Sequence, residues 1–161
     1  MIEFENSGPA LSEHDLTLVE AATGRPLPQP YRDFLLAHNG GRPVLDIIDI
    51  EGAPFKGTGL HTFYGIHPGD DTNDLLANFE SLEGCKENQL LPIAYDDFAR
   101  SFILVLAEDH YGEVYYFELT GEEPVPYFVA NDFNEFLSKL REPTPEELAD
   151  IDNAADAPDD G

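Results

Sequence analysis

Apolar residues at helical spacing dominate the first third of the chain. Ser12 followed by Asp15 forms a capping-box pattern, which predicts a helix that begins after Ser12 and ends before Gly24. The apolar face of this helix is Leu16, Val19 and Ala22. Pro30 suits the first turn of a second helix, because its missing N–H has no helical partner there. The buried face predicted for this second helix is Tyr31, Phe34 and Leu35.

The pattern then changes to that of strands. Residues 44–50 and 61–66 are rich in β-branched and aromatic side chains, and we interpret them as strands with a loop over 52–59 between them. A cap formed by Asp70, Asp71 and Thr72 predicts a third helix. Its apolar residues are Leu75, Leu76, Phe79 and Leu82.

The second half of the chain is predicted to be mostly sheet. Turn-rich pieces separate four apolar runs, which are 90–95, 101–107, 113–119 and 125–130. This spacing favours an antiparallel meander. Residues 102–106 are apolar at every position, so we expect a central strand that is covered on both faces. A closing helix from about Asn131 presents Phe133, Phe136, Leu137 and Leu140 at helical spacing.

These elements predict one α+β domain over residues 1–141, with a mostly antiparallel curved sheet, N-terminal helices and a closing C-terminal helix. Residues 142–161 contain eight acidic and no basic side chains, so we expect a solvated, disordered tail. The tail begins with a capping-box pattern, Thr144 to Glu147, which favours a helical turn at its start.

The charge of the chain excludes two classes of partner. Among 161 residues there are 33 acidic and 8 basic side chains, a formal net charge of -25. Removing the tail leaves 25 acidic against 8 basic residues, so the domain itself carries -17. Nucleic-acid binding requires clustered Lys and Arg, and anionic membranes repel acidic surfaces, so we expect neither partner.

The termini and the single cysteine bear on compartment and chemistry. The N-terminal residues lack the basic and apolar regions of a secretory signal, so we expect a cytoplasmic protein. Cys85 is alone, which rules out an internal disulfide and a thiolate zinc site.

Enzymatic chemistry finds little support in the motifs. His61, His67, Asp70 and Asp71 could together bind a divalent ion, but their spacing matches no known site, and helix capping explains the two aspartates better. We therefore expect no catalytic residue, no metal and no cofactor, and a metal-dependent hydrolase is only the third interpretation.

Four strings, in this order, resemble the SUKH superfamily. They are LPQPYRDFLLAHNGGRPV (27–44), LLPIAYD (90–96), GEVYYFEL (112–119) and VANDFNEFLSKL (129–140). The resemblance spans about residues 10–141. The chain departs from the family at 97–100, where relatives usually have a glycine-rich turn, and at Tyr116 and Phe117, where a tryptophan is common.

The resemblance implies a binding protein, because many bacterial members look like immunity proteins that neutralise toxins, often nucleases. The acidity then predicts that a cognate toxin domain binds a carboxylate-rich surface. The candidate partner-binding residues are Asp46, Asp49, Glu51, Asp70, Asp71, Asp96, Asp97, Glu108, Asp109 and Glu113. Two alternatives stay open: an intracellular scaffold or regulatory adaptor of the same fold, and an acidity that serves only solubility.

Overall fold

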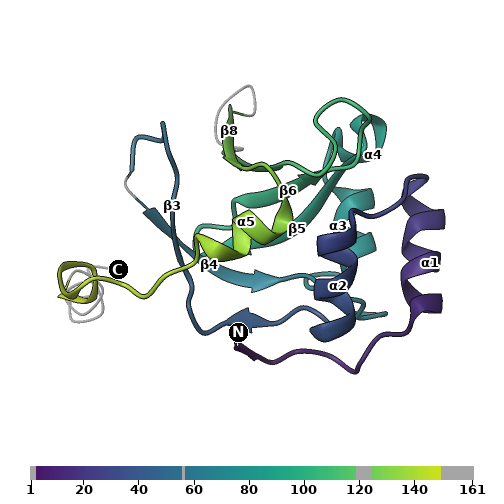
Figure 1. Cartoon of the computed structure of the whole chain (residues 1–161), viewed down its shortest axis with the longest axis horizontal. Coiled ribbons are helices and arrows are strands. Elements are labelled where there is room, and N and C mark those ends of the chain that lie inside the picture. The colour runs from purple at the N-terminus through teal and green to yellow at the C-terminus, as the bar shows by residue number, and fades with distance from the viewer. Residues whose placement is uncertain (1–2, 56, 119–124, 150–161) are drawn as a thin grey trace, which may run out of the picture.

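The computed structural model describes residues 3–55, 57–118 and 125–149 and has an α+β architecture (Figure 1). Six antiparallel strands form a curled sheet in the order β3-β4-β5-β6-β7-β8, and a two-stranded sheet pairs β1 with β2. The strands are β1 (Phe4–Glu5), β2 (Arg42–Pro43), β3 (Ile47–Asp49), β4 (Gly57–Phe63), β5 (Leu90–Asp96), β6 (Ser101–Val105), β7 (Val114–Glu118) and β8 (Val125–Ala130). The helices are α1 (Glu13–Thr23), α2 (Gln29–Ala37), α3 (Leu75–Ser81), α4 (Cys85–Asn88) and α5 (Phe133–Ser138). The fold class predicted from the sequence is confirmed.

The two N-terminal helices form as their local signals predict. Ser12 and Asp15 make a reciprocal capping box on α1, and Gly24 follows the helix in a left-handed conformation (φ 76°). One detail of the predicted apolar face is wrong, because Ala22 is exposed and Thr23 is buried in its place. In α2, Pro30 occupies the first turn, and the three predicted core residues are buried.

The meander of β5 to β8 is confirmed, and β6 is its central strand. Every residue of β6 is buried, and the strand lies between β5 and β7. An uninterrupted apolar run therefore did indicate a strand covered on both faces.

Two boundaries in the first half differ from the prediction. The strand predicted over 44–50 is shorter in the structure, because β3 contains only Ile47–Asp49; the preceding Arg42 and Pro43 form the separate strand β2, which pairs with β1. The strand β4 starts at Gly57, inside the predicted loop. Glycines are rare in strand interiors, so a strand that opens with Gly57 and Gly59 resembles a loop in sequence.

The cap of α3 is Asp74 rather than residues 70–72. The Asp74 carboxylate accepts a hydrogen bond from the Ala77 N–H at 3.0 Å. Asp70 instead closes the preceding turn by accepting from the N–H groups of Thr72 and Asn73. Asp70, Asp71 and Asp74 all precede the apolar run, but only Asp74 directly precedes Leu75, the first residue of the helix, which is the position of an N-cap.

The core beneath the closing helix is aromatic. Helix α5 lies across the sheet in Figure 1, and its Phe133 packs against Tyr31 (5.0 Å between ring centroids), Phe34 (4.8 Å) and Phe63 (6.1 Å). Phe136 reaches Phe102 on β6 at 5.4 Å. The aromatic face of α5 therefore packs against both helix α2 and the sheet.

The chain after α5 returns to the edge of the sheet. Arg141 exchanges two backbone hydrogen bonds with Ile47 of β3, at 3.0 and 2.8 Å. Beyond it, residues 145–149 are helical, and Thr144 and Glu147 form the predicted capping box. The expectation of disorder for 150–161 falls outside the described residues.

A candidate acidic binding surface

One face of β4 is opened by glycine and covered by carboxylates. Thr58 and Leu60 point inward and are buried, so Gly57, Gly59 and His61 lie on the opposite face, which we call the outer face. A Cβ on Gly57 would lie 3.0 Å from Oδ1 of Asp49, and one on Gly59 would overlap Oδ2 of Asp97. The two carboxylates therefore occupy the space that side chains would fill.

Asp46 joins these two carboxylates. Its backbone oxygen accepts the Leu60 N–H at 2.7 Å, which fixes it beside the same stretch of β4. Burial raises the pKa of the Asp46 carboxyl above its ordinary value; the Arg42 guanidinium, 3.9 Å away, opposes this shift, and the charge of Asp97 adds to it. The charge of Asp97 therefore acts on Asp46, and Asp49 lies beside Gly57 on the same strand β4 that Asp97 covers at Gly59. We call Asp46, Asp49 and Asp97 the acidic face.

Asp49 also ties the acidic face to the C-terminal segment. The Arg141 guanidinium donates to both carboxylate oxygens of Asp49, at 3.1 and 2.8 Å, and to both oxygens of Glu147. Glu51 is exposed two residues beyond Asp49, where both border a groove of about 390 Å³ between β3 and β8. Lys139 and Phe128 border the same groove from α5 and β8.

A second hollow borders the acidic face on its other side. Arg42, His61, Asp70 and Tyr95 are among the residues around this pocket of about 310 Å³. The His61 ring stacks on Tyr95, with 5.1 Å between centroids. Hydrogen bonds from Asn73 and the turn lower the pKa of the Asp70 carboxyl, so it stays ionised, and Asp71 is exposed beside it.

Asp96 points the other way, into the protein. It is 1% exposed, and its carboxylate accepts hydrogen bonds from Thr58 Oγ1 (2.8 Å), from the Tyr116 hydroxyl, and from the N–H groups of Phe98 (2.9 Å) and Arg100 (2.8 Å). A side chain so placed organises the β5–β6 turn and offers no surface to a partner. We therefore remove Asp96 from the candidate binding residues.

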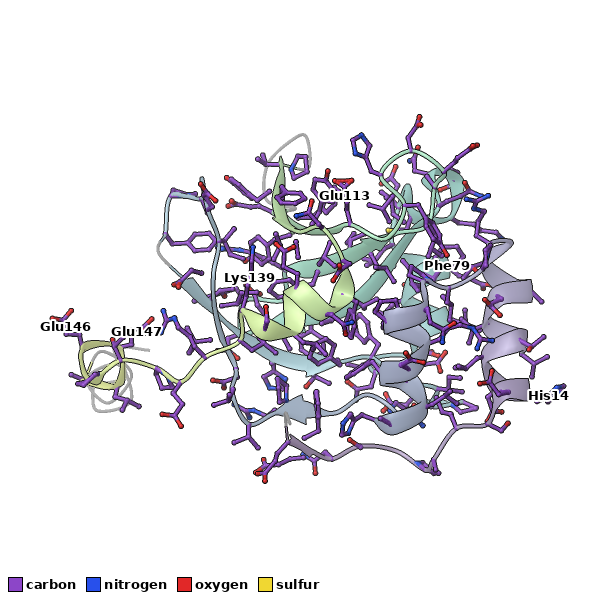
Figure 2. The ribbon with its side chains drawn as sticks, viewed as in Figure 1. His14, Phe79, Glu113, Lys139, Glu146 and Glu147 are labelled. Atoms are coloured by element: carbon purple, nitrogen blue, oxygen red, sulfur yellow. The ribbon has the colours of Figure 1, made fainter. Side chains whose placement is uncertain are left out.

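Glu108, Asp109 and Glu113 lie at the opposite end of the sheet. They belong to the β6–β7 loop, which follows the end of β6 that pairs with Leu90, whereas the acidic face lies at the Asp96 end of β5. Arg25 and Tyr111 tie this loop to the segment after α1. Figure 2 shows Glu113 far from Glu147, which shares Arg141 with Asp49. The ten predicted acids therefore do not form one continuous surface.

Two kinds of reactive centre, a metal cluster and an activated thiol, can be compared with the described residues. Within them, no three His, Cys, Asp or Glu side chains come together in a group that could hold a metal ion. Cys85 is buried, and burial raises the pKa of its thiol to about 11, which keeps it protonated and unreactive at neutral pH. The acidic face is suited instead to binding cationic side chains.

One exposed residue escaped the sequence reasoning. Phe98, in the turn after Asp96, is 70% exposed. In the sequence, residues 97–100 differ from the glycine-rich turn of the family, but this difference gives no indication of an exposed ring. A phenylalanine set between Asp97 and Arg100, outside any apolar period, was the signal available.

Comparison with protein-family models and known sequences places this fold. A search of curated proteins found no match. In the part of the chain that the structure describes, no helix is long and apolar enough to cross a membrane. The family model described as SMI1 / KNR4 family (SUKH-1) matches residues 10–139, which include both N-terminal helices, the whole six-stranded sheet and α5. Because this match covers most of the chain, the protein belongs to the SMI1/KNR4 family of SUKH domains.

Proposed function

We propose that this protein is an immunity protein that binds a cognate toxin domain through the acidic face and neutralises it without chemistry. The observation that carries the proposal is that the carboxylates of Asp49 and Asp97 cover the glycines of β4, with Asp46 close enough to Asp97 for its pKa to respond to that charge. Glu51, Asp70 and Asp71 extend the same side of the domain around its two hollows. Membership of the SUKH family supports a protein partner.

The charge suggests what kind of toxin fits. An enzyme that acts on nucleic acid presents a basic cleft to its polyanionic substrate. Carboxylates held against the strand β4 can lie where phosphates would lie, and a domain of net charge -17 attracts such a cleft from a distance. We therefore propose that the toxin is a nuclease. It would act on nucleic acid in the same cytoplasm in which this protein binds it.

Co-expression tests the proposal directly. Cells that produce the toxin domain encoded beside this gene should survive when this protein is present and die when it is absent. A regulatory adaptor would protect against no toxin and would instead copurify with resident proteins. Survival that does not depend on this protein would contradict the proposed function.

The role of the acidic face needs a matched control. We expect Asp46→Asn combined with Asp97→Asn to slow association with the purified toxin domain by about tenfold at low salt, because steering charges are lost. Glu108→Gln combined with Asp109→Asn removes the same charge from the opposite end of the sheet and should change the rate about twofold or less. Equal effects of the two pairs would favour general acidity over a directed surface. Raising the salt concentration should reduce the difference in association rate between the Asp46→Asn/Asp97→Asn variant and the wild type, because salt screens exposed charges.

A further inference from the structure

Phe98 is exposed to solvent on a turn that hydrogen bonds hold in place. Its own N–H and that of Arg100 donate to Oδ1 of the buried Asp96, at 2.9 and 2.8 Å. The Asp97 N–H donates to the Gly59 oxygen at 2.9 Å, and the Ala99 N–H to the Asp96 oxygen at 3.0 Å. The Asp96 N–H also donates to the Arg100 oxygen at 2.9 Å, so all five backbone donors of residues 96–100 are satisfied within the protein, while the phenyl ring lies outside.

The ring is also supported from beneath. The Arg100 guanidinium lies between two phenyl rings, 5.0 Å from the centroid of Phe55 and 5.2 Å from that of Phe98. It donates a hydrogen bond to the Tyr116 hydroxyl at 3.2 Å, and Phe55 packs edge-on against Tyr116 at 5.9 Å. Arg100 therefore connects the buried Tyr116 to the exposed Phe98 through a hydrogen bond and cation–π contacts.

We propose that Phe98 is the anchor residue of the toxin interface and inserts into an apolar pocket that Lys and Arg side chains surround. The inference rests on the proposed function and deepens it. Aromatic side chains that are rigid before binding lose little entropy on docking, and they account for much of the energy of many interfaces. Asp97 is the next residue in the chain and Asp46 shares its environment, so the pocket that receives Phe98 must carry positive charge at its rim.

Exposure alone would not distinguish Phe98, because single exposed apolar residues are common on protein surfaces. Leu18 on α1 is 54% exposed and makes a suitable comparison. Phe98 differs from it in three ways: the Arg100 guanidinium against its ring, the hydrogen-bonded turn around it and the acidic face beside it. These features together suit an anchor in a charged interface.

The test measures binding of the purified, catalytically inactive toxin domain encoded beside this gene. We expect Phe98→Ala to weaken the equilibrium affinity at least tenfold. Leu18→Ala should stay within about twofold of the wild type. Both variants should keep the wild-type melting temperature, since both side chains are largely in solvent. Binding of Phe98→Ala within twofold of the wild type would overturn the anchor while leaving the proposed function intact.

If the wild type binds no such toxin, a second measurement tests whether Phe98 still anchors a partner, which separates failure of the proposed function from failure of the anchor. The photoreactive residue p-benzoylphenylalanine is placed at position 98 and, as control, at position 18, in the source cells. An adduct from position 98 alone, weakened by Asp97→Asn, would keep the anchor and replace the toxin with another basic partner. No adduct from position 98, or equal adducts from both positions, would overturn the anchor as well.

Discussion

The hydroxyl of Tyr116 on β7 donates a hydrogen bond to the buried carboxylate of Asp96 on β5, across the intervening strand β6. Thr58 on β4 donates to the same carboxylate oxygen at 2.8 Å. One side chain therefore joins three strands of the sheet and, through its other oxygen, the β5–β6 turn. A buried carboxylate is stable when hydrogen bonds satisfy it, and its removal leaves several donors without partners.

We expect Asp96→Ala to lower the free energy of unfolding by about 3 kcal/mol, because buried donors lose their acceptor. Urea denaturation followed by circular dichroism measures the change. The control is Asp97→Ala, an exposed neighbour whose loss should change the stability by about 0.5 kcal/mol or less. Similar losses in the two variants would show that the buried network contributes nothing particular.

Tyr31 offers the opposite case. Its hydroxyl is buried and has no hydrogen-bond partner among the described residues, and burial raises the pKa of the phenol far above its usual value. Tyr31→Phe should therefore leave the protein as stable or raise its unfolding free energy by up to about 1 kcal/mol. Tyr116→Phe removes a hydroxyl that is hydrogen-bonded and should destabilise by about 1 to 2 kcal/mol. A marked loss in Tyr31→Phe would mean that its hydroxyl has a partner in solution, such as a buried water.

Ala99 occupies a left-handed conformation, with φ of 63°. This conformation is costly for a residue with a Cβ. Ala99→Gly should raise the unfolding free energy by about 0.5 to 1 kcal/mol. Ala77→Gly, in the first turn of α3, should lower it by up to about 1 kcal/mol, which controls for the flexibility of glycine itself. Destabilisation in both variants would show that the turn relaxes in solution.

The pairing of Glu147 with Arg141 should make the attachment of the C-terminal turn depend on pH. The Arg141 hydrogen bonds lower the pKa of the Glu147 carboxyl to about 2, from an ordinary value of 4.5. A lowered pKa stabilises the attached state above the ordinary value, and this contribution is lost as the pH falls from 4.5 through about 2. NMR titration of the Glu147 carboxyl carbon measures it. In Arg141→Gln the midpoint should return toward the ordinary value; an unchanged midpoint would contradict the pairing.

Truncation separates the C-terminal segment from the edge of the sheet. A chain that ends at Arg141 should keep its melting temperature within a few degrees, since Leu148 is 48% exposed and the lost ion pair is near the surface. A chain that ends at Leu140 also loses the two backbone hydrogen bonds to Ile47, so it should melt clearly lower. Equal melting temperatures of the two truncations would mean that the Arg141 bridge does not stabilise the domain.

Elements whose signals are local could be predicted from the sequence. The capping box of Ser12, the buried run of β6 and the spacing of Phe133 and Phe136 each carry their meaning within a few residues. The start of β4 could not be predicted, because Gly57 and Gly59 owe their place to carboxylates from β3 and from beyond β5. Composition showed an excess of acid but not its distribution.

The candidate site shows the same limit. Asp96 and Asp97 are adjacent in the sequence, yet Asp96, the last residue of β5, points inward, whereas Asp97, the first residue of the turn, lies against Gly59 on the outer face of β4. Whether a given acid is structural or exposed depends on Thr58 and Tyr116, which lie far along the chain. Residues as distant as Asp49 and Asp97 come together only through strand pairing.

The bridge between Arg141 and Ile47 also has a consequence for the order of folding. The outer edge of β3 is closed by a residue made almost a hundred positions later, whereas the meander of β5 to β8 is built from neighbours in sequence. A nascent chain can assemble the meander while it emerges from the ribosome, but the edge of β3 has no partner until translation passes Arg141. During that interval the edge is open to pairing with other chains, so we expect the growing chain to be most vulnerable to aggregation until Arg141 has been added.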